Sequence, residues 1–196
     1  MMKITFSPTH TFFTSDTHFF HSKVIRYCNR PFQSVEQMNE VLIENWNSVV
    51  KKKDTVFHLG DFCFGSPAQW NDILDKLNGK IHLIIGNHDQ KVCRKLENRF
   101  ESISMQMYIN IDGQIICFNH YPFLCYSGSG WKVWQLHGHI HINSDGISDV
   151  IDKSRMDMLL PGQYDVGVDN NNFTLVSFDK VKDCIFRQFE KLRDTQ

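Results

Sequence analysis

Short apolar runs alternate with longer amphipathic stretches along this chain of 196 residues. Runs rich in β-branched and aromatic residues predict strands, because such residues fit a pleated, half-buried surface. These runs cover residues 11–15, 55–59, 80–85, 134–136 and 174–178. Two further runs, 107–111 and 114–118, flank Asp112-Gly113 and predict a β-hairpin. Since strands alternate with helical stretches, we expect an α/β fold with a mixed sheet.

Three amphipathic stretches predict helices that cover the sheet. Ser34 can cap the first helix, with Gln37 as its capping-box partner. The apolar stripe of this helix consists of Val35, Met38, Val41, Leu42, Trp46 and Val49. Ser66-Pro67 can begin the second helix and Gly79 can end it. The stripe of the second helix consists of Trp70, Ile73, Leu74 and Leu77. The third helix is expected from about residue 179 to about residue 191.

Five short blocks of polar residues follow predicted strands, where an open α/β sheet places its ligands. In chain order they are Asp16-Thr17-His18, Gly60-Asp61, Gly86-Asn87-His88-Asp89, His120 before Tyr121-Pro122, and Gly138-His139-Ile140-His141. Their carboxylate, amide and imidazole groups suit Mn, Fe or Zn without any thiolate. Seven such side chains are too many for one four- to six-coordinate ion. Two ions bridged by one carboxylate fit the count, and Asp61 is the expected bridge because its block holds a single ligand.

The ordered set D-x-H, G-D, G-N-H-D, a lone His and G-H-x-H resembles the calcineurin-like metallophosphoesterase family. The match runs from Asp16 to His141, and no block is missing. The stretches His18–His21, Arg26–Phe32 and His58–Phe62 are similar to a compact bacterial and phage branch of that family, known only as predicted phosphoesterases. The resemblance implies a four-layer α/β/β/α sandwich with mixed sheets and a dinuclear metal site at the sheet edge.

The resemblance also implies how two divalent ions share these side chains. The first ion would be held by Asp16, His18, Asp61 and His141, and the second by Asp61, Asn87, His120 and His139. Mn²⁺ is the favoured ion, with Fe, Zn or Ni as alternatives. Two ions about 3.5–4 Å apart generate a hydroxide near neutral pH and clamp the phosphate oxygens. We therefore expect a metal-dependent phosphoesterase in which the activated hydroxide attacks the phosphoester.

Asp61 and His88 are the catalytic candidates. His88 directly follows a ligand, so we expect it at the rim of the site, where its imidazole can protonate the leaving oxygen. The competing interpretation is a structural histidine. Asp89 can orient the His88 ring. Three basic residues after the first block can reach a substrate phosphate, although ordinary solvated loop charge competes with that role: His21, Arg26 and Arg30.

Residues 60–65 narrow the choice of substrate. They lack the additional Asp and the phosphate-gripping Arg of the G-D-x-x-D-R-G form in protein Ser/Thr phosphatases, which disfavours a phosphoprotein. We favour a phosphodiester, because small family members without that Arg are often phosphodiesterases. The alternatives are a phosphomonoester of a small molecule or nucleotide, and a non-catalytic scaffold. The loop 125–132 is a candidate lid. Nearby aromatic residues can stack on a base but are more typical of a core: Tyr121, Phe123, Tyr126, Trp131 and Trp134.

Composition excludes several classes of protein. The formal net charge of −1 gives no global attraction to nucleic acid or membrane, so nucleic acid is a partner that charge does not favour. The six cysteines form no C-x-x-C pair, which argues against a zinc ribbon and suits a reducing compartment. Residues 1–6 lack the apolar region of a signal peptide, and no run is long enough to span a membrane. We expect one domain, 1–196, in the cytoplasm; the oligomeric state stays open.

Overall fold

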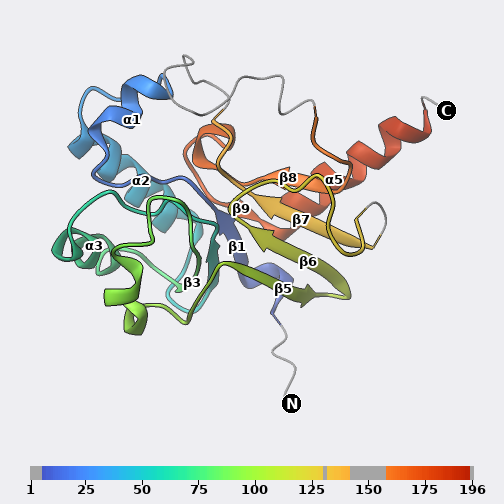
Figure 1. Ribbon diagram of the computed structural model, residues 1–196, viewed down its shortest axis with the longest axis horizontal. Helices are drawn as coiled ribbons and strands as arrows, with labels where there is room; N and C mark the ends of the chain where they lie inside the picture. The colour runs from blue at the N-terminus through green and yellow to red at the C-terminus, as the bar shows by residue number, and fades with distance from the viewer. Residues whose placement is uncertain (1–5, 130–131, 142–157, 195–196) are drawn as a thin grey trace.

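Two mixed β-sheets form the centre of the molecule, shown in Figure 1 as a computed structural model that describes residues 6–129, 132–141 and 158–194. The first sheet has the order β4-β3-β2-β1-β9. Its strands are β1 (Thr11–Thr14), β2 (Thr55–His58), β3 (Lys80–Ile84), β4 (Ser102–Ser104) and β9 (Val176–Ser177). β1 to β4 are parallel and β9 is antiparallel to β1. The carboxyl ends of the parallel strands therefore share one edge of the sheet.

The second sheet has the order β5-β6-β7-β8. Its strands are β5 (Gln106–Ile111), β6 (Gln114–Asn119), β7 (Val133–His137) and β8 (Gln163–Asp165). The predicted hairpin is confirmed, because β5 and β6 pair antiparallel from Gln106–Asn119 to Ile111–Gln114. β6, β7 and β8 run parallel. The predicted α/β fold with two mixed sheets is confirmed.

Four α-helices are described, namely α1 (Ser22–Tyr27), α2 (Val35–Val49), α3 (Pro67–Leu74) and α5 (Phe178–Arg193). Short 3₁₀ turns connect other segments: η1 (Pro8–His10), η2 (Cys93–Lys95), η3 (Glu97–Arg99) and η4 (Val168–Asn170). Figure 1 shows α1, α2 and α3 on one side of the molecule and the second sheet on the other. α5 packs against β8 and β9. None of the described helices is long and apolar enough to cross a membrane.

The predictions from the sequence were more accurate for the first residues of the helices than for the last. Ser34 caps α2 by accepting a hydrogen bond from the Gln37 N–H. The Gln37 side chain accepts from the N–H of Gln33, whereas a capping box would use the N–H of Ser34 itself. Ser66 forms the complete capping box of α3. The prediction that Gly79 ends this helix was wrong. α3 ends at Leu74, and Gly79 lies in the following turn with φ +97°, a conformation that glycine adopts without strain.

The buried stripe of α2 also differs from the predicted one: three of the six predicted residues are not fully buried, and one buried residue was not predicted. Val49 is 37 % exposed at the end of the helix. Asn39 is buried instead, and its side-chain oxygen accepts a hydrogen bond from the Phe20 N–H. A polar residue is tolerated there because its acceptor is satisfied. It ties α2 to the loop that follows β1, and this loop carries two of the predicted metal ligands.

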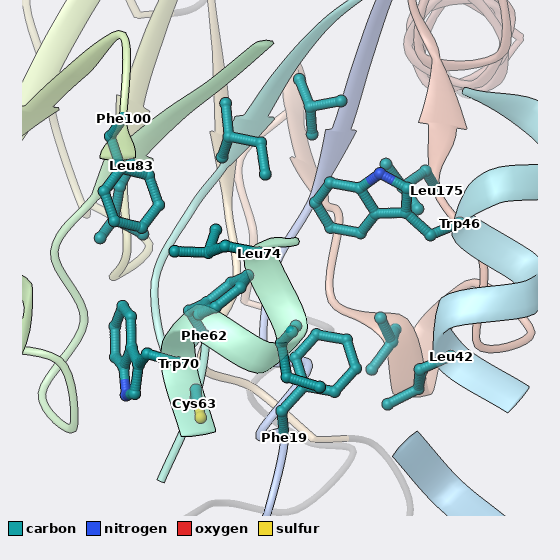
Figure 2. Close-up of a cluster of buried hydrophobic side chains, with 14 of the residues drawn as sticks. Phe19, Leu42, Trp46, Phe62, Cys63, Trp70, Leu74, Leu83, Phe100 and Leu175 are labelled. Carbon is teal, nitrogen blue, oxygen red and sulfur yellow. The ribbon is translucent and has the colours of Figure 1, made fainter. Parts of the chain in front are cut away.

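Two apolar layers hold the sheets and helices together. Figure 2 shows the outer layer, in which Trp46 of α2 and Trp70 of α3 face residues of the first sheet such as Leu83. The inner layer lies between the sheets, where Phe57 of β2 contacts Phe118 of β6 with ring centroids 4.8 Å apart. Burial at both layers fixes the two sheets relative to each other. The strand ends that carry the polar blocks are thereby held at one edge.

Candidate metal centre

The five polar blocks meet at this edge. Asp16 and His18 follow β1, Asp61 follows β2, and the remaining blocks follow β3, β6 and β7. The loops after β1 and β2 are joined by backbone hydrogen bonds: the Asp16 N–H donates to the Gly60 carbonyl at 2.9 Å, and the His18 N–H donates to the Asp61 carbonyl at 3.0 Å. Backbone hydrogen bonds therefore hold the first two blocks in a fixed relative position, independently of any ion.

Six of the seven predicted ligands form two groups, each with its ligand atoms within 4.8 Å of one another. The groups are Asp16, His18 and His141, and Asp61, His120 and His139. Asn87 lies beside the second group, since its Oδ1 is 3.0 Å from His120 Nε2. Asp61 lies between the groups: its Oδ2 is 3.5 Å from His18 Nε2 and 3.6 Å from His120 Nε2. This is the position that a carboxylate shared by two cations would need.

Four of these residues have a left-handed backbone, with φ values of 58° for Asp16, 50° for His18, 56° for Asp61 and 72° for His139. Residues other than glycine rarely adopt these backbone angles, and holding one residue there costs about 1–3 kcal/mol of conformational free energy. Strain of this kind persists only where the surrounding structure imposes it. The fold thus directs these four side chains into one space at the expense of local backbone energy.

Two motif glycines leave room for carboxylates. A Cβ at Gly86 would overlap Asp61 Oδ1, and a Cβ at Gly138 would overlap Asp16 Oδ2. Neither position has a positive φ, so close approach explains glycine here and backbone conformation does not. The Gly that precedes Asn87 and the Gly that precedes His139 are therefore part of the packing around the two acidic groups.

The donor set fits divalent metal ions. Asp16 Oδ1 is buried without a hydrogen-bond partner, although an isolated buried carboxylate oxygen is costly. His120 Nδ1 lies 2.8 Å from the Leu59 carbonyl, to which it donates, so Nε2 keeps its lone pair. That lone pair faces another acceptor, Asn87 Oδ1. A cation at the second group would satisfy the two acceptors 3.0 Å apart, and a cation at the first group would satisfy the unpaired oxygen of Asp16.

Burial also favours the neutral imidazoles that bind metals. Burial, together with the nearby His141, holds the pKa of His18 well below its ordinary value. Burial and His120 lower the pKa of His139 to about 4. Metal binding requires a deprotonated ring nitrogen, so both side chains are in their ligating form at neutral pH.

His141 is oriented by an aspartate that the sequence did not single out. Its Nδ1 lies 2.5 Å from Oδ2 of Asp169 in η4, and its Nε2 lies 3.8 Å from Asp16 Oδ1. Burial alone would raise the pKa of the Asp169 carboxyl, but the Arg30 guanidinium and His141 hold it well below its ordinary value. A carboxylate behind a ligating histidine fixes the ring and raises its basicity. A Gly two residues earlier, as in G-x-D, is the one weak signal for Asp169.

Arg30 is not available to a substrate, so its predicted role as a phosphate contact was wrong. It is 4 % exposed. Its Nε and NH2 donate to the two oxygens of Asp169 at 2.8 and 2.7 Å. The remaining donors go to the carbonyls of Asp16 and Thr17 and to the sulfur of Met38. All five N–H groups of the guanidinium are thus occupied. Arg30 instead secures both Asp169 and the backbone that carries the first block.

The two other predicted substrate contacts remain accessible. Arg26 is exposed on α1, with its guanidinium 5.6 Å from the centre of the Tyr27 ring. His21 is half-buried, and its Nδ1 lies 3.2 Å from His18 Nδ1. Burial and the nearby His88 lower the pKa of His21 to about 4, so its ring is neutral near neutral pH. Contact of either residue with a substrate stays a prediction.

His88 lies at the open side of the site. Its side chain is 38 % exposed, and its Nε2 is 4.0 Å from Asp61 Oδ2. The prediction that Asp89 orients this ring was wrong. Asp89 is fully buried, and its oxygens accept from the N–H groups of Asp61, Phe62 and Gly86 at 2.8–2.9 Å. Asp89 therefore shapes the backbone on both sides of Asp61.

The predicted lid lies partly outside the described residues, which omit 130 and 131. Before that gap, the Ser129 N–H donates to the Tyr126 carbonyl in a turn. A lid function for 125–132 stays a prediction. The aromatic residues near this loop do not act as one cluster: Trp134 belongs to the inner core, whereas Tyr121 is exposed beside the metal centre.

Replacing Asp169 by Asn should weaken metal binding by the His141 group about 10- to 100-fold, the usual effect of removing a hydrogen-bonded partner of a ligand. Asn preserves size but removes the charge that faces His141 Nδ1. Calorimetric titration of the metal-free protein with Mn²⁺ measures the change. Asp75→Asn is the control, because Asp75 pairs with Arg99 at the surface. Unchanged affinity in Asp169→Asn would contradict the positioning role.

Comparison with known proteins gives one family and several relatives. Residues 9–176 match the model of the calcineurin-like phosphoesterase family. The chain is 40 % identical over 131 residues to an uncharacterized protein of Methanocaldococcus jannaschii, covering 66 % of this chain and 68 % of that protein. It is 28 % identical over 204 residues to the Gene 66 protein of Mycobacterium phage D29, covering 90 % and 96 %. A solved protein of unknown function from Aquifex aeolicus shares the fold, with a TM-score of 0.68, 25 % identity, and coverage of 89 % and 98 %.

Proposed function

Since the chain belongs to the calcineurin-like phosphoesterase family, we propose that it hydrolyses phosphodiesters with two divalent metal ions, Mn²⁺ foremost. The family by itself implies metal-dependent hydrolysis of a phosphoester. Its phage relatives confirm the resemblance to the phage branch that the motifs indicated. The preference for diesters, the number of ions and their identity are the further steps of the proposal.

The position of Asp61 carries the two-ion part of the proposal. Its Oδ2 has a histidine nitrogen of each ligand group within 3.6 Å. A single ion held by one group would leave the other group's buried side chains without a partner. Asp16 and His141 each add a ligand atom to the first group, and His139 adds one to the second. Two ions sharing Asp61 satisfy both groups at once.

The residues of this chain have distinct tasks in the proposed reaction. When bound, two divalent ions supply an activated hydroxide and neutralise charge on the phosphate. Asp61 holds both sites at a fixed separation. His88, exposed beside Asp61, is placed to give a proton to the departing oxygen. Its backbone N–H donates to Asp61 Oδ1 at 2.9 Å, which keeps the proton donor and the bridge in a fixed relation.

The hydrogen bonds of Arg30 within the protein support the preference for a diester. A monoester carries one more negative charge, which a phosphate-binding arginine normally neutralises. Arg30 is the buried cation closest in sequence to the first block, and its five donors are occupied by the protein. Lys23 and Arg26 are accessible cations that follow this block, and Arg26 is the arginine among them. If Arg26 does not reach the phosphate, none of the predicted substrate contacts supplies an arginine to neutralise the extra charge of a monoester.

We expect chelation to abolish hydrolysis of bis-p-nitrophenyl phosphate and added Mn²⁺ to restore it. Oxygen- and nitrogen-rich sites without thiolate hold Mn²⁺ near the weak end of the divalent order, so the ion is removable. The metal-reloaded protein should show higher kcat/KM for the bis-ester than for p-nitrophenyl phosphate. Metal quantification accompanies the assay and should give two ions per chain.

Three other outcomes distinguish the alternatives. A higher kcat/KM for the monoester would overturn the diester preference, and an Arg26→Gln variant that loses this activity would identify the cation responsible. Two bound ions with no hydrolysis of either ester or of cyclic nucleotides would favour the scaffold. A single ion per chain at saturating Mn²⁺ would contradict the bridge at Asp61.

A further inference from the structure

Two exposed aromatic side chains border the metal centre. Phe64 is 51 % exposed and Tyr121 is 41 % exposed. Most aromatic residues of the described chain contribute to the two core layers, where burial of the ring stabilises the fold. A ring left half open to water contributes less to stability, and both of these rings contact histidines of the site. Their exposure is therefore more informative than that of an isolated surface aromatic.

Phe64 lies on the side of the first ligand group. Its ring is stacked on the His21 ring, with centroids 4.2 Å apart and an interplanar angle of 11°. His21 in turn contacts His18 through its Nδ1 at 3.2 Å. Phe64 also meets the His88 ring at 5.2 Å and 63°. The stack with His21 holds one face of Phe64, and the side chain is still half exposed next to the proposed proton donor.

Tyr121 lies on the side of the second ligand group. Its ring centroid is 4.7 Å from that of His139 and 5.0 Å from that of His120, at steep angles of 69° and 70°. Its hydroxyl reaches towards Asn87 Oδ1 at 3.5 Å. The ring is therefore held by two histidines of the second group, and its hydroxyl by Asn87 beside that group. Phe64 and Tyr121 thus contact different sets of histidines at the site.

We propose that Phe64 and Tyr121 stack the two bases of a nucleobase-bearing phosphodiester whose phosphate is held at the metal centre. This inference rests on the proposed function. A diester has two substituents that leave the phosphorus in different directions, and the site offers one exposed ring beside each ligand group. Every base has an aromatic face, so such stacking tolerates different sequences.

Charge supports recognition by stacking over recognition by a basic surface. The ring contacts of Phe64 and Tyr121 are imidazoles, and the polar contact of Tyr121 is an amide. Arg30, the buried cation of the site, is occupied by Asp169. The formal net charge of the chain is −1. Affinity for a nucleotide would therefore come mainly from the ions at the phosphate and from the rings at its substituents, with Arg26 as the accessible arginine after the first block.

The test combines two ring variants with two abasic substrates. Thymidylyl-thymidine is compared with its two analogues, each of which lacks one base. In the metal-loaded wild type, loss of either base should lower kcat/KM about 10-fold, mainly through KM, as expected for one base stacked on an aromatic side chain. In Phe64→Leu one of these losses should disappear, and in Tyr121→Leu the other should disappear.

Matched variants separate stacking from general damage. Phe186 and Tyr108 are 49 % and 45 % exposed elsewhere on the surface, so Phe186→Leu and Tyr108→Leu should retain both losses. Tyr121→Phe keeps the ring and should also retain both. Two bound ions in every variant, measured by metal quantification, show that the centre itself is intact.

The outcomes also separate this inference from the proposed function. Hydrolysis of bis-p-nitrophenyl phosphate without any effect of base removal on the dinucleotide would overturn base stacking and leave the phosphodiesterase standing. Base stacking is overturned in the same way if the bis-ester is cleaved and the dinucleotide is not. Failure to cleave either diester with two ions bound would overturn both. If base stacking is confirmed, competition experiments identify the substrate that carries the bases. A longer oligothymidylate that inhibits dinucleotide hydrolysis more strongly than a dinucleotide does indicates a single strand, and equal inhibition indicates a small nucleotide.

Discussion

Replacing Asp61 by Asn removes most of the activity and weakens metal binding by both ligand groups. Asn keeps the shape of the side chain and can still accept the His88 N–H at Oδ1. It loses the negative charge at Oδ2, the atom that lies 3.5 Å from His18 Nε2 and 3.6 Å from His120 Nε2. Because two cations would share that charge, the affinity should fall by more than the 10- to 100-fold typical of a hydrogen-bonded partner of a ligand.

Metal titration and kcat/KM for bis-p-nitrophenyl phosphate measure this effect together. Asp112→Asn is a matched control, since Asp112 has φ 50° in an exposed hairpin turn and Asp61 has φ 56°. The control separates the loss of charge from any effect of Asn on a left-handed backbone, which Asn tolerates well. Two tightly bound ions and wild-type turnover in Asp61→Asn would rule out Asp61 as the bridge.

Replacing His88 by Ala lowers turnover about 10²–10⁴-fold while the metal content stays at its wild-type value. The range is that of general acid–base catalysis by one side chain. The metal should remain because none of the predicted ligands is removed and because the backbone N–H at this position still donates to Asp61 Oδ1. The loss should be largest for a diester with a poor leaving group, which needs a proton most.

Two comparisons make the His88 experiment decisive. A good leaving group such as p-nitrophenolate should mask part of the loss, so the variant is assayed on an alkyl or nucleoside ester as well. His10→Ala serves as the control, because the exposed His10 pairs with Asp54. Unchanged turnover of His88→Ala on the poor leaving group would reject proton donation by this residue.

The sequence indicated which side chains meet at the sheet edge because its signals are local. Each block follows a short apolar strand, and the parallel order of β1, β2 and β3 brings the ends of these strands together. Glycine at 86 and 138 is required by contacts with acidic groups of other blocks, yet it is visible in the sequence as part of a fixed motif. The ligand roles themselves stay predictions until an ion is measured.

The failures have a common physical cause. Arg30 and Asp169 are 139 positions apart, and nothing near either residue indicates that they pair. An exposed basic loop was the natural expectation for Arg30, whereas burial beside a carboxylate is decided by the tertiary fold. Asp89 likewise hydrogen-bonds backbone groups near Asp61, 28 positions away. Short elements such as β4 and β8 were missed because three residues are too few to show a period.

The pairing of Arg30 with Asp169 also bears on how the chain acquires its metal during synthesis. Asp16 and His18 are synthesised first, and His141 and its supporting Asp169 follow more than a hundred residues later. A site that does not exist in the unfolded chain cannot capture an ion before its distant parts have docked. Contacts at such sequence separation form slowly. We therefore expect full affinity for metal only in a chain whose earlier and later segments have already come together.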